Sequence, residues 1–364
     1  MSVESAASKI QMQLAEALRA KRAAAGIDTT ASVEPVTATE IVESIAPPEG
    51  KILLSKILPS GIFNAAKGHR DIFITMCDES LLSESQKARI PDVNPVYRPN
   101  MHTLWLLAYA IESGRGPTML TGLPSVGKSS LVEFYCAITR KPFYRFNYNG
   151  TMDASSLLGT QSASGGSTHW HDGMITEAVQ CPNAVLLHDE WTFAPAEVTA
   201  ALQYLLEVNG KLILADKPGT VADKTVIPHP GVRMVFADNT KGQGDPSGKF
   251  IGTQPQNTAT LDRIGSFIEV KFMDEADEVA MVMDNFPSAT KRLALTLVKT
   301  ANLCRQAYEQ GSLSTIVSQR VVASWMQHAL NLNDTKLGLE LAFLNRLDSD
   351  TEKQTVLGFL KLVS

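Results

Sequence analysis

The middle of the chain alternates between two patterns of apolar residues. Apolar residues recur at helical spacing over 101–113, 127–139 and around 195–208. Continuous apolar runs, in contrast, occupy 117–121, 143–147, 183–188 and 232–237. Runs of this kind are typical of parallel strands that helices cover on both faces of the sheet. The pattern therefore predicts an α/β fold with a doubly wound parallel sheet.

The flanking segments have other patterns. Apolar residues at every fourth position of 1–24 predict an amphipathic helix, and the Thr, Pro, Ala and Glu content of 26–50 is typical of a linker. Beyond about Lys271 the apolar periodicity is helical throughout. We therefore expect the following parts: an N-terminal helix and flexible linker (1–50), a small N-terminal segment (51–100), the α/β domain (101–271) and a C-terminal helical lid (272–364).

Composition narrows the class of protein. The 364 residues, 44% of them hydrophobic, are enough for a substantial core, and a net charge of −5 does not favour nucleic acid or an anionic membrane. The four cysteines form no Cys-x-x-Cys pair, which favours a reducing compartment. No segment reaches the roughly 20 apolar residues that a membrane span needs. The expected location is the cytoplasm.

One stretch, "TGLPSVGKSS", has the complete G-x-x-x-x-G-K-[ST] spacing of a phosphate-binding loop. It lies between a predicted strand and a predicted helix, which is the context that such a loop requires. Its backbone N–H groups would face the phosphates of ATP, Lys128 would reach the β and γ oxygens, and the Ser129 hydroxyl would bind Mg²⁺. The candidate binding residues are Gly122, Leu123, Pro124, Ser125, Val126, Gly127, Lys128, Ser129 and Ser130.

An acidic pair ends the apolar run "AVLLHDE". Asp189 would orient Mg²⁺, and Glu190 would polarise the attacking water. An acidic pair at the end of a strand is also common as a solvated turn. Because a full phosphate loop precedes it, the catalytic interpretation is favoured.

Further polar candidates follow the acidic pair. Asn239, after the run "RMVFAD", would share the attacking water, although an Asx turn that opens the next loop would suit the same residue type. Arg263 lies before the predicted lid and Arg320 opens one of its helices. Surface arginines are mostly solvated charges, so their positions alone indicate little.

Six motifs, in order over roughly residues 90–335, resemble those of one family of ATPases. They are "TGLPSVGKSS", "AVLLHDEW", "LEVNGKLILAD", "HPGVRMVFADNTKGQGD", "GTQPQNTATLDRIGSF" and "VSQRVVASW". Together they are similar to the AAA+ ATPase subunit of aerobic cobaltochelatase (CobS-like), within the MoxR and magnesium-chelatase group. The resemblance implies an AAA+ P-loop NTPase that binds ATP and Mg²⁺ at the interfaces of a homo-hexameric ring.

The resemblance also implies roles for single residues. Asn239 resembles the first sensor, Arg263 the arginine finger offered to the neighbouring subunit, and Arg320 the second sensor. The implied partner is a protein of von Willebrand (CobT-like) or chelatase type. Two positions depart from the family pattern: His188 stands where Phe is common, and Ala237-Asp238 stands where Thr-Ala is common.

An inserted loop between the second and third strands is also implied, facing the axial surface of the ring. It corresponds to Leu157–Gln180, whose central Ser, Gly and Thr residues are typical of a hairpin. Its "HWH" sequence, 169–171, provides two histidines on one side with no third metal ligand in view, which favours contact with a partner or substrate over metal binding.

Two other functions stay open as alternatives. A nucleic-acid translocase of the modification-dependent restriction type would need Lys or Arg along the inserted loop, and Leu157–Gln180 contains none. A module in which nucleotide mainly holds a ring together would be distinguished only by its turnover. The favoured function is a ring-forming ATPase that remodels or activates a partner protein.

Overall fold

A computed structural model describes residues 50–58, 70–94, 97–114, 116–149, 152–164, 166–194, 196–244 and 255–364. The helix and the linker that the sequence predicts before residue 50 lie outside the described residues. Among the residues described, no helix combines the length and the apolar character needed to cross a membrane.

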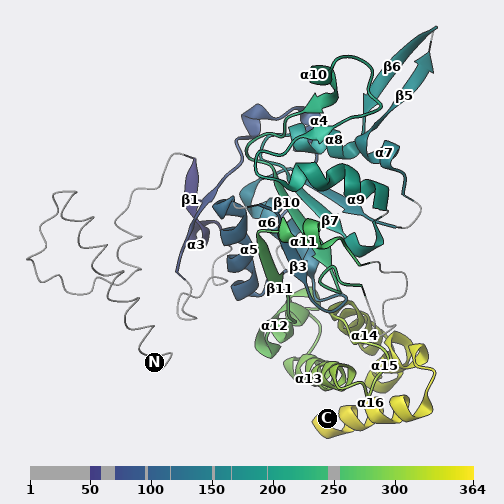
Figure 1. Cartoon of the computed structure of the whole chain (residues 1–364). Coiled ribbons are helices and arrows are strands. Elements are labelled where there is room, and N and C mark those ends of the chain that lie inside the picture. Colours follow the sequence, from purple (N-terminus) through teal and green to yellow (C-terminus); the bar gives the residue numbers. More distant parts are fainter. Residues whose placement is uncertain are drawn as a thin grey trace, which may run out of the picture. The chain divides into compact units, whose positions relative to one another are not determined.

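The centre of the fold is a parallel sheet of five strands (Figure 1). Their order is β11 (Ser266–Glu269), β3 (Thr118–Thr121), β10 (Arg233–Asp238), β7 (Val185–Asp189) and β4 (Phe143–Asn147). Strand β10 is hydrogen-bonded to both β3 and β7, so the carboxyl ends of these three strands meet at one edge. Ligands of open α/β sheets bind at this kind of edge.

Helices cover both faces of the sheet, as the apolar strands predict. On one face, α5 (Met101–Ser113) and α6 (Lys128–Thr139) share a core with Leu120, Leu187 and Val235. On the other, α8 (Met174–Gln180) and α9 (Ala196–Gln203) share a core with the intervening residues Met119, Leu186 and Phe236. Because side chains alternate along a strand, both sets are buried. The predicted doubly wound α/β fold is confirmed.

The C-terminal helices form a core of their own. They are α12 (Glu275–Asn285), α13 (Lys291–Glu309), α14 (Gln319–Leu332), α15 (Thr335–Ala342) and α16 (Asp350–Val363), with the turn η5 (Leu344–Arg346). Trp325 is fully buried at their centre. A buried ion pair joins Arg305 of α13 to Glu278 of α12 at 2.6 Å, and the guanidinium lies over the Phe272 ring. These contacts fix the first two helices to the segment that follows β11.

The inserted loop forms the predicted hairpin. Strands β5 (Gly159–Ser164) and β6 (Ser167–Asp172) pair antiparallel between α7 (Ala154–Leu158) and α8, and Figure 1 shows them as a projecting ribbon. Gly159 has φ +140°, and a Cβ there would lie 2.3 Å from the Trp170 ring, so the base of the hairpin requires glycine. A second insertion carries β8 (Leu212–Ile213), α10 (Val221–Lys224) and β9 (Thr225–Val226).

The N-terminal segment is small and mixed. It contains β1 (Lys51–Leu53), α3 (Leu54–Ile57), β2 (Phe73–Thr75), η2 (Glu79–Leu81) and α4 (Glu84–Lys87), and β1 pairs antiparallel with β2. One of its links to the α/β layers is Glu112 of α5, whose carboxylate accepts from the Thr75 backbone N–H at 3.0 Å and faces Lys51 and Lys141.

Two predicted elements need correction. The helix predicted around 195–208 spans Ala196–Gln203 and continues as the 3-10 turn η4 (Tyr204–Leu206). Strand β11 was absent from the predicted strands, because only Ile268 of its four residues is buried and no apolar run marks it. The short elements η3 (Trp191–Phe193) and α11 (Thr258–Asp262) complete the fold. The domain boundaries drawn from the sequence stay predictions.

Candidate functional site

The phosphate loop connects β3 to α6 through residues in left-handed conformations. Gly122 (φ +143°), Ser125 (φ +60°) and Gly127 (φ +92°) turn the backbone, and Gly127 is the N-cap of α6. A Cβ on Gly122 would lie 2.3 Å from the carbonyl oxygen of Val270, so this position admits only glycine. Consecutive turns of this kind, followed by a helix N-terminus, form a concave site for an anion.

Lys128 is a buried cation at the start of α6. Its Nζ donates to the carbonyl oxygens of Gly122 and Leu123 at 2.9 and 3.1 Å, and to Asn239 Oδ1 at 2.6 Å. Burial lowers the pKa of this ammonium to about 8, although nearby carboxylates oppose the shift. A cation whose hydrogen-bond partners are neutral oxygens is a suitable binding group for phosphate.

Ser129 and Asp189 meet beside this lysine. The Ser129 hydroxyl donates to Asp189 Oδ2 at 2.6 Å, although 60 residues separate the two in sequence. Strand β7 ends at Asp189, whose side chain is 8% exposed. A hydroxyl and a carboxylate are the hard oxygen ligands that Mg²⁺ prefers next to a nucleotide. The donor set therefore fits the predicted metal.

Glu190 has an unusual backbone conformation. Its φ of 55° and ψ of 43° are left-handed, and its carbonyl oxygen accepts a hydrogen bond from the Phe193 N–H at 2.9 Å. This conformation is less stable by about 1 kcal/mol for a residue other than glycine. Strained backbone of this kind is often found at functional sites. The turn directs Glu190 away from the axis of β7, and the residue is exposed.

A cavity of about 170 Å³ gathers most of the candidates from four parts of the chain, although Gly122, Leu123 and Val126 are not among its lining residues. Asn239 follows β10 and Arg320 is the second residue of α14, so both the sheet edge and the lid contribute. The lining residues are Pro124, Ser125, Gly127, Lys128, Ser129, Ser130, Arg145, Asp189, Glu190, Ala237, Asp238, Asn239 and Arg320. The structure thus brings together the phosphate loop, the acidic pair, Asn239 and Arg320.

Arg263 does not line this cavity. It caps the C-terminus of α11, forms an ion pair with Glu207 at 2.7 Å, and donates to the carbonyl oxygen of Ala259 at 2.6 Å. Among the described residues, its buried Nε has no hydrogen-bond partner. The predicted finger is therefore separate from the site of its own chain.

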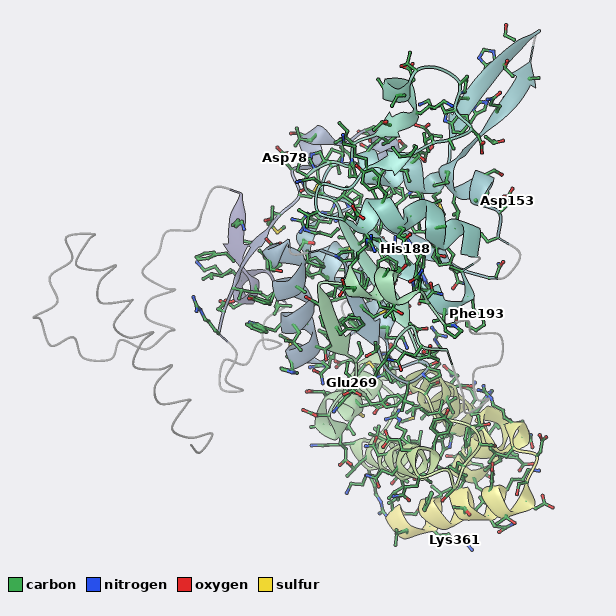
Figure 2. All side chains as sticks on the ribbon, viewed as in Figure 1. Asp78, Asp153, His188, Phe193, Glu269 and Lys361 are labelled. Atoms are coloured by element: carbon green, nitrogen blue, oxygen red, sulfur yellow. The ribbon has the colours of Figure 1, made fainter. Side chains whose placement is uncertain are left out.

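The two departures from the family pattern have structural roles. Asp238 is buried and accepts from the Thr192 hydroxyl at 2.6 Å and from the Gly242 N–H at 2.7 Å, so the turn interpretation applies to Asp238 while Asn239 contacts Lys128. His188 is fully buried, and Figure 2 shows it inside the α/β layers.

His188 is held by aromatic neighbours. Its Nδ1 is 2.8 Å from the Tyr148 hydroxyl, and its ring stacks on Phe236 with 4.6 Å between centroids. Burial lowers the pKa of the imidazole to about 3, so the ring is neutral at pH 7. As a neutral aromatic ring, His188 can pack in the core in the way that the Phe of the family pattern would.

Sequence reasoning missed Arg145 of β4. Its guanidinium donates to Asp189 Oδ2 through Nε at 3.0 Å and Nη2 at 2.6 Å. The β4–β7 pairing sets Arg145 opposite Leu187, two residues before Asp189. No local motif indicates this contact, because it depends on the register of two strands that are far apart in the sequence.

A second pocket adjoins the phosphate loop and was also missed. It shares Gly127 with the first cavity and receives residues from the N-terminal segment, from α5 and α6, from the segment after β11 and from the lid. The lining residues are Tyr97, Arg98, Asn100, Thr103, Val126, Gly127, Leu131, Val270, Lys271, Met273 and Gln319. Its volume is about 10 Å³, which is room for about one water molecule, so the pocket as it stands does not hold a nucleoside.

Comparisons with known proteins agree with this geometry. A family model described as "AAA domain (dynein-related subfamily)" matches residues 117–250, which include the phosphate loop, the acidic pair and Asn239. Aerobic cobaltochelatase subunit CobS of a Sinorhizobium species is 29% identical over 269 residues, which cover 72% of this chain and 79% of CobS.

Two further relatives differ in size. Protein NorQ of Paracoccus denitrificans is 27% identical over 239 residues, covering 65% of this chain and 82% of NorQ. Midasin of Dictyostelium discoideum is 29% identical over 209 residues, covering 56% of this chain but 3% of midasin. The parallel sheet, the loop after β3 and these similarities together identify the chain as an ATP-hydrolysing AAA+ protein that is similar to the MoxR-like and CobS-related ATPases.

Proposed function

We propose that this ATPase assembles into a ring, hexameric as the resemblance implies, and couples Mg-ATP hydrolysis to remodelling or activation of a partner protein. The observation that carries the proposal is the division of the catalytic residues. One cavity holds Lys128, Ser129, Asp189 and Glu190, while Arg263 lies outside it. A neighbouring subunit would complete such a site.

Each residue of the cavity has a proposed role. The phosphate loop and Lys128 bind the triphosphate, and Arg320 contacts it from the lid. Ser129 and Asp189 would hold Mg²⁺, which neutralises charge that develops on the phosphates. Glu190 polarises the attacking water, and Asn239 orients that water.

The partner is proposed to be a protein of von Willebrand (CobT-like) or chelatase type. CobS is by its name a subunit of a larger enzyme, which supports joint action with another protein. The β5–β6 hairpin offers a contact surface: Trp170 donates from Nε1 to Asp172 at 2.8 Å, and His171 Nε2 lies 2.7 Å from the Ser162 hydroxyl. Because Leu157–Gln180 has no Lys or Arg, nucleic acid is not favoured as the substrate.

We expect nucleotide to drive assembly of the ring. A nucleotide that contacts two subunits binds the assembled state more tightly, so it shifts the equilibrium toward that state. Light scattering at several protein concentrations, with and without a non-hydrolysable ATP analogue, measures this shift. A mass that is the same under all conditions would refute nucleotide-driven assembly, and Lys128→Ala serves as the control that should not respond.

We also expect the affinity for ATP to fall at alkaline pH. The pKa of Lys128 is lowered to about 8 in the free protein, and bound phosphate would raise it. Below about pH 8 Lys128 is charged in both the free and the nucleotide-bound protein, so the affinity for ATP is constant. Above this pH, binding must take up a proton, and the Kd should rise by up to about ten-fold per pH unit.

Nucleotide titrations from about pH 7 to about pH 9.5 test this expectation. Lys128→Arg is the matched variant, since a guanidinium keeps its charge over this range. It should bind more weakly at neutral pH yet show no rise in Kd. A flat profile for the unmodified protein would mean that Lys128 does not titrate in the free site.

A further inference from the structure

The Asp189 carboxylate already has a cationic partner within the chain. Arg145 Nε and Nη2 both donate to Asp189 Oδ2, at 3.0 and 2.6 Å. The Ser129 hydroxyl donates to the same oxygen at 2.6 Å. Among the described residues, every hydrogen bond to this carboxylate therefore falls on a single oxygen, the one that lies next to Ser129.

The two members of this ion pair differ in exposure. The Asp189 side chain is 8% exposed, whereas the Arg145 side chain is 46% exposed and lines the rim of the cavity. Strand β7 is buried on all five residues, so Asp189 is held in place. Strand β4 is at the edge of the sheet, and the long Arg145 side chain can leave the carboxylate without disturbing the core.

A metal ion held at this site and the Arg145 guanidinium would share one carboxylate. Ser129 and Asp189 are the residues that would hold Mg²⁺, and the same Asp189 carboxylate accepts two hydrogen bonds from Arg145. Two cations on one carboxylate oxygen repel each other, and the repulsion is stronger at the edge of a protein than in bulk water. Metal binding would therefore weaken the Arg145 contact, and the Arg145 contact would oppose metal binding.

We propose that Arg145 is a positioning residue that holds Asp189 before the metal arrives and is displaced by Mg²⁺, so that this ion pair sets the Mg²⁺ concentration at which the site loads. The inference rests on the proposed function, because it requires Mg-nucleotide to bind in this cavity. In the free site Arg145 gives this largely buried carboxylate a cation that hydrogen-bonds to it directly. The competition makes loading dependent on the metal as well as on the nucleotide.

The test is a Mg²⁺ titration of nucleotide binding, read from the fluorescence of a non-hydrolysable ATP analogue. For Arg145→Gln, the Mg²⁺ concentration at half-saturation should fall by about five-fold, which corresponds to about 1 kcal/mol for a partly exposed ion pair. The Mg²⁺ midpoint of Arg145→Lys should lie between those of the unmodified protein and Arg145→Gln, since an ammonium keeps the charge but forms fewer hydrogen bonds.

Arg140→Gln is the matched control. Arg140 also pairs with a carboxylate, Glu79 at 2.8 Å, and is 43% exposed, but it does not line the cavity. It should bind with the Mg²⁺ dependence of the unmodified protein.

Different results would contradict the role of Arg145 and the proposed function. An unchanged or higher Mg²⁺ midpoint for both Arg145 variants would overturn the inference, and so would a Mg-nucleotide complex in which Arg145 still contacts Asp189 Oδ2. Failure of the unmodified protein to bind the analogue at any Mg²⁺ concentration would instead count against the proposed function. If Arg145→Gln does not fold, the Arg145→Lys midpoint alone decides.

Discussion

Glu190→Gln is expected to lower kcat for ATP hydrolysis by about 10³-fold and to leave nucleotide affinity within about two-fold. The amide keeps the shape and the backbone turn of the carboxylate but cannot polarise water. The phosphate loop is untouched, so Lys128 and Ser129 still bind the triphosphate. Steady-state turnover and an equilibrium nucleotide titration, made on the same preparation, measure the two quantities.

The control for Glu190→Gln is the same change at Glu133, an exposed residue of α6. It removes an equal charge close to the site without touching the cavity lining. Turnover should then stay near that of the unmodified protein. If Glu190→Gln itself keeps near-normal turnover, the catalytic base lies elsewhere and the proposed role of this residue is wrong.

Arg263→Ala is expected to be nearly inactive alone and partly rescued by a second inactive variant. An arginine finger stabilises charge on a phosphate held by the adjacent subunit, and its loss costs about 10³-fold or more in rate. Lys128→Ala should lose ATP binding but keep its own Arg263. In mixed rings, some interfaces join an intact phosphate loop to an intact finger, so the mixture should turn over ATP faster than either variant.

A second mixture supplies the control for this rescue. Lys128→Ala and Glu190→Gln both damage the cavity of their own chain, so no interface between them is complete and mixing should give no gain. Subunit exchange is verified by fluorescence in both mixtures. If exchange occurs and Arg263→Ala is still not rescued, Arg263 does not act between subunits and its contacts with Glu207 and Ala259 are its function.

The buried strands of this fold could be predicted because their residues are almost all apolar. All five positions of β7 and four of the six in β10 are buried, and both strands read as continuous apolar runs. Strand β11 has a single buried residue, Ile268, and its hydrogen bonds to β3 rather than its composition make it a strand. Edge strands of this kind are specified by their partner, which local pattern does not reveal.

The same distinction separates the predicted from the missed parts of the site. Lys128 and Ser129 are adjacent in one motif, and Asp189 ends a recognisable strand. Their positions in the sequence were therefore enough to predict them as site residues. Arg145 reaches Asp189 only through the pairing of β4 with β7. The pocket beside Gly127 joins residues from Tyr97 to Gln319. Neither feature exists until the chain has folded.

The left-handed backbone of Glu190 implies a conflict between stability and activity. Glycine or asparagine adopts this conformation more readily than glutamate, so selection for thermal stability alone would favour those residues after β7. If Glu190 polarises the attacking water as proposed, that role is the reason for a carboxylate at this strained position. Chains of this fold that have lost hydrolysis and serve as inert subunits would be free to relax the turn, and an Asp-Gly or Asp-Asn sequence at the end of this strand would mark them.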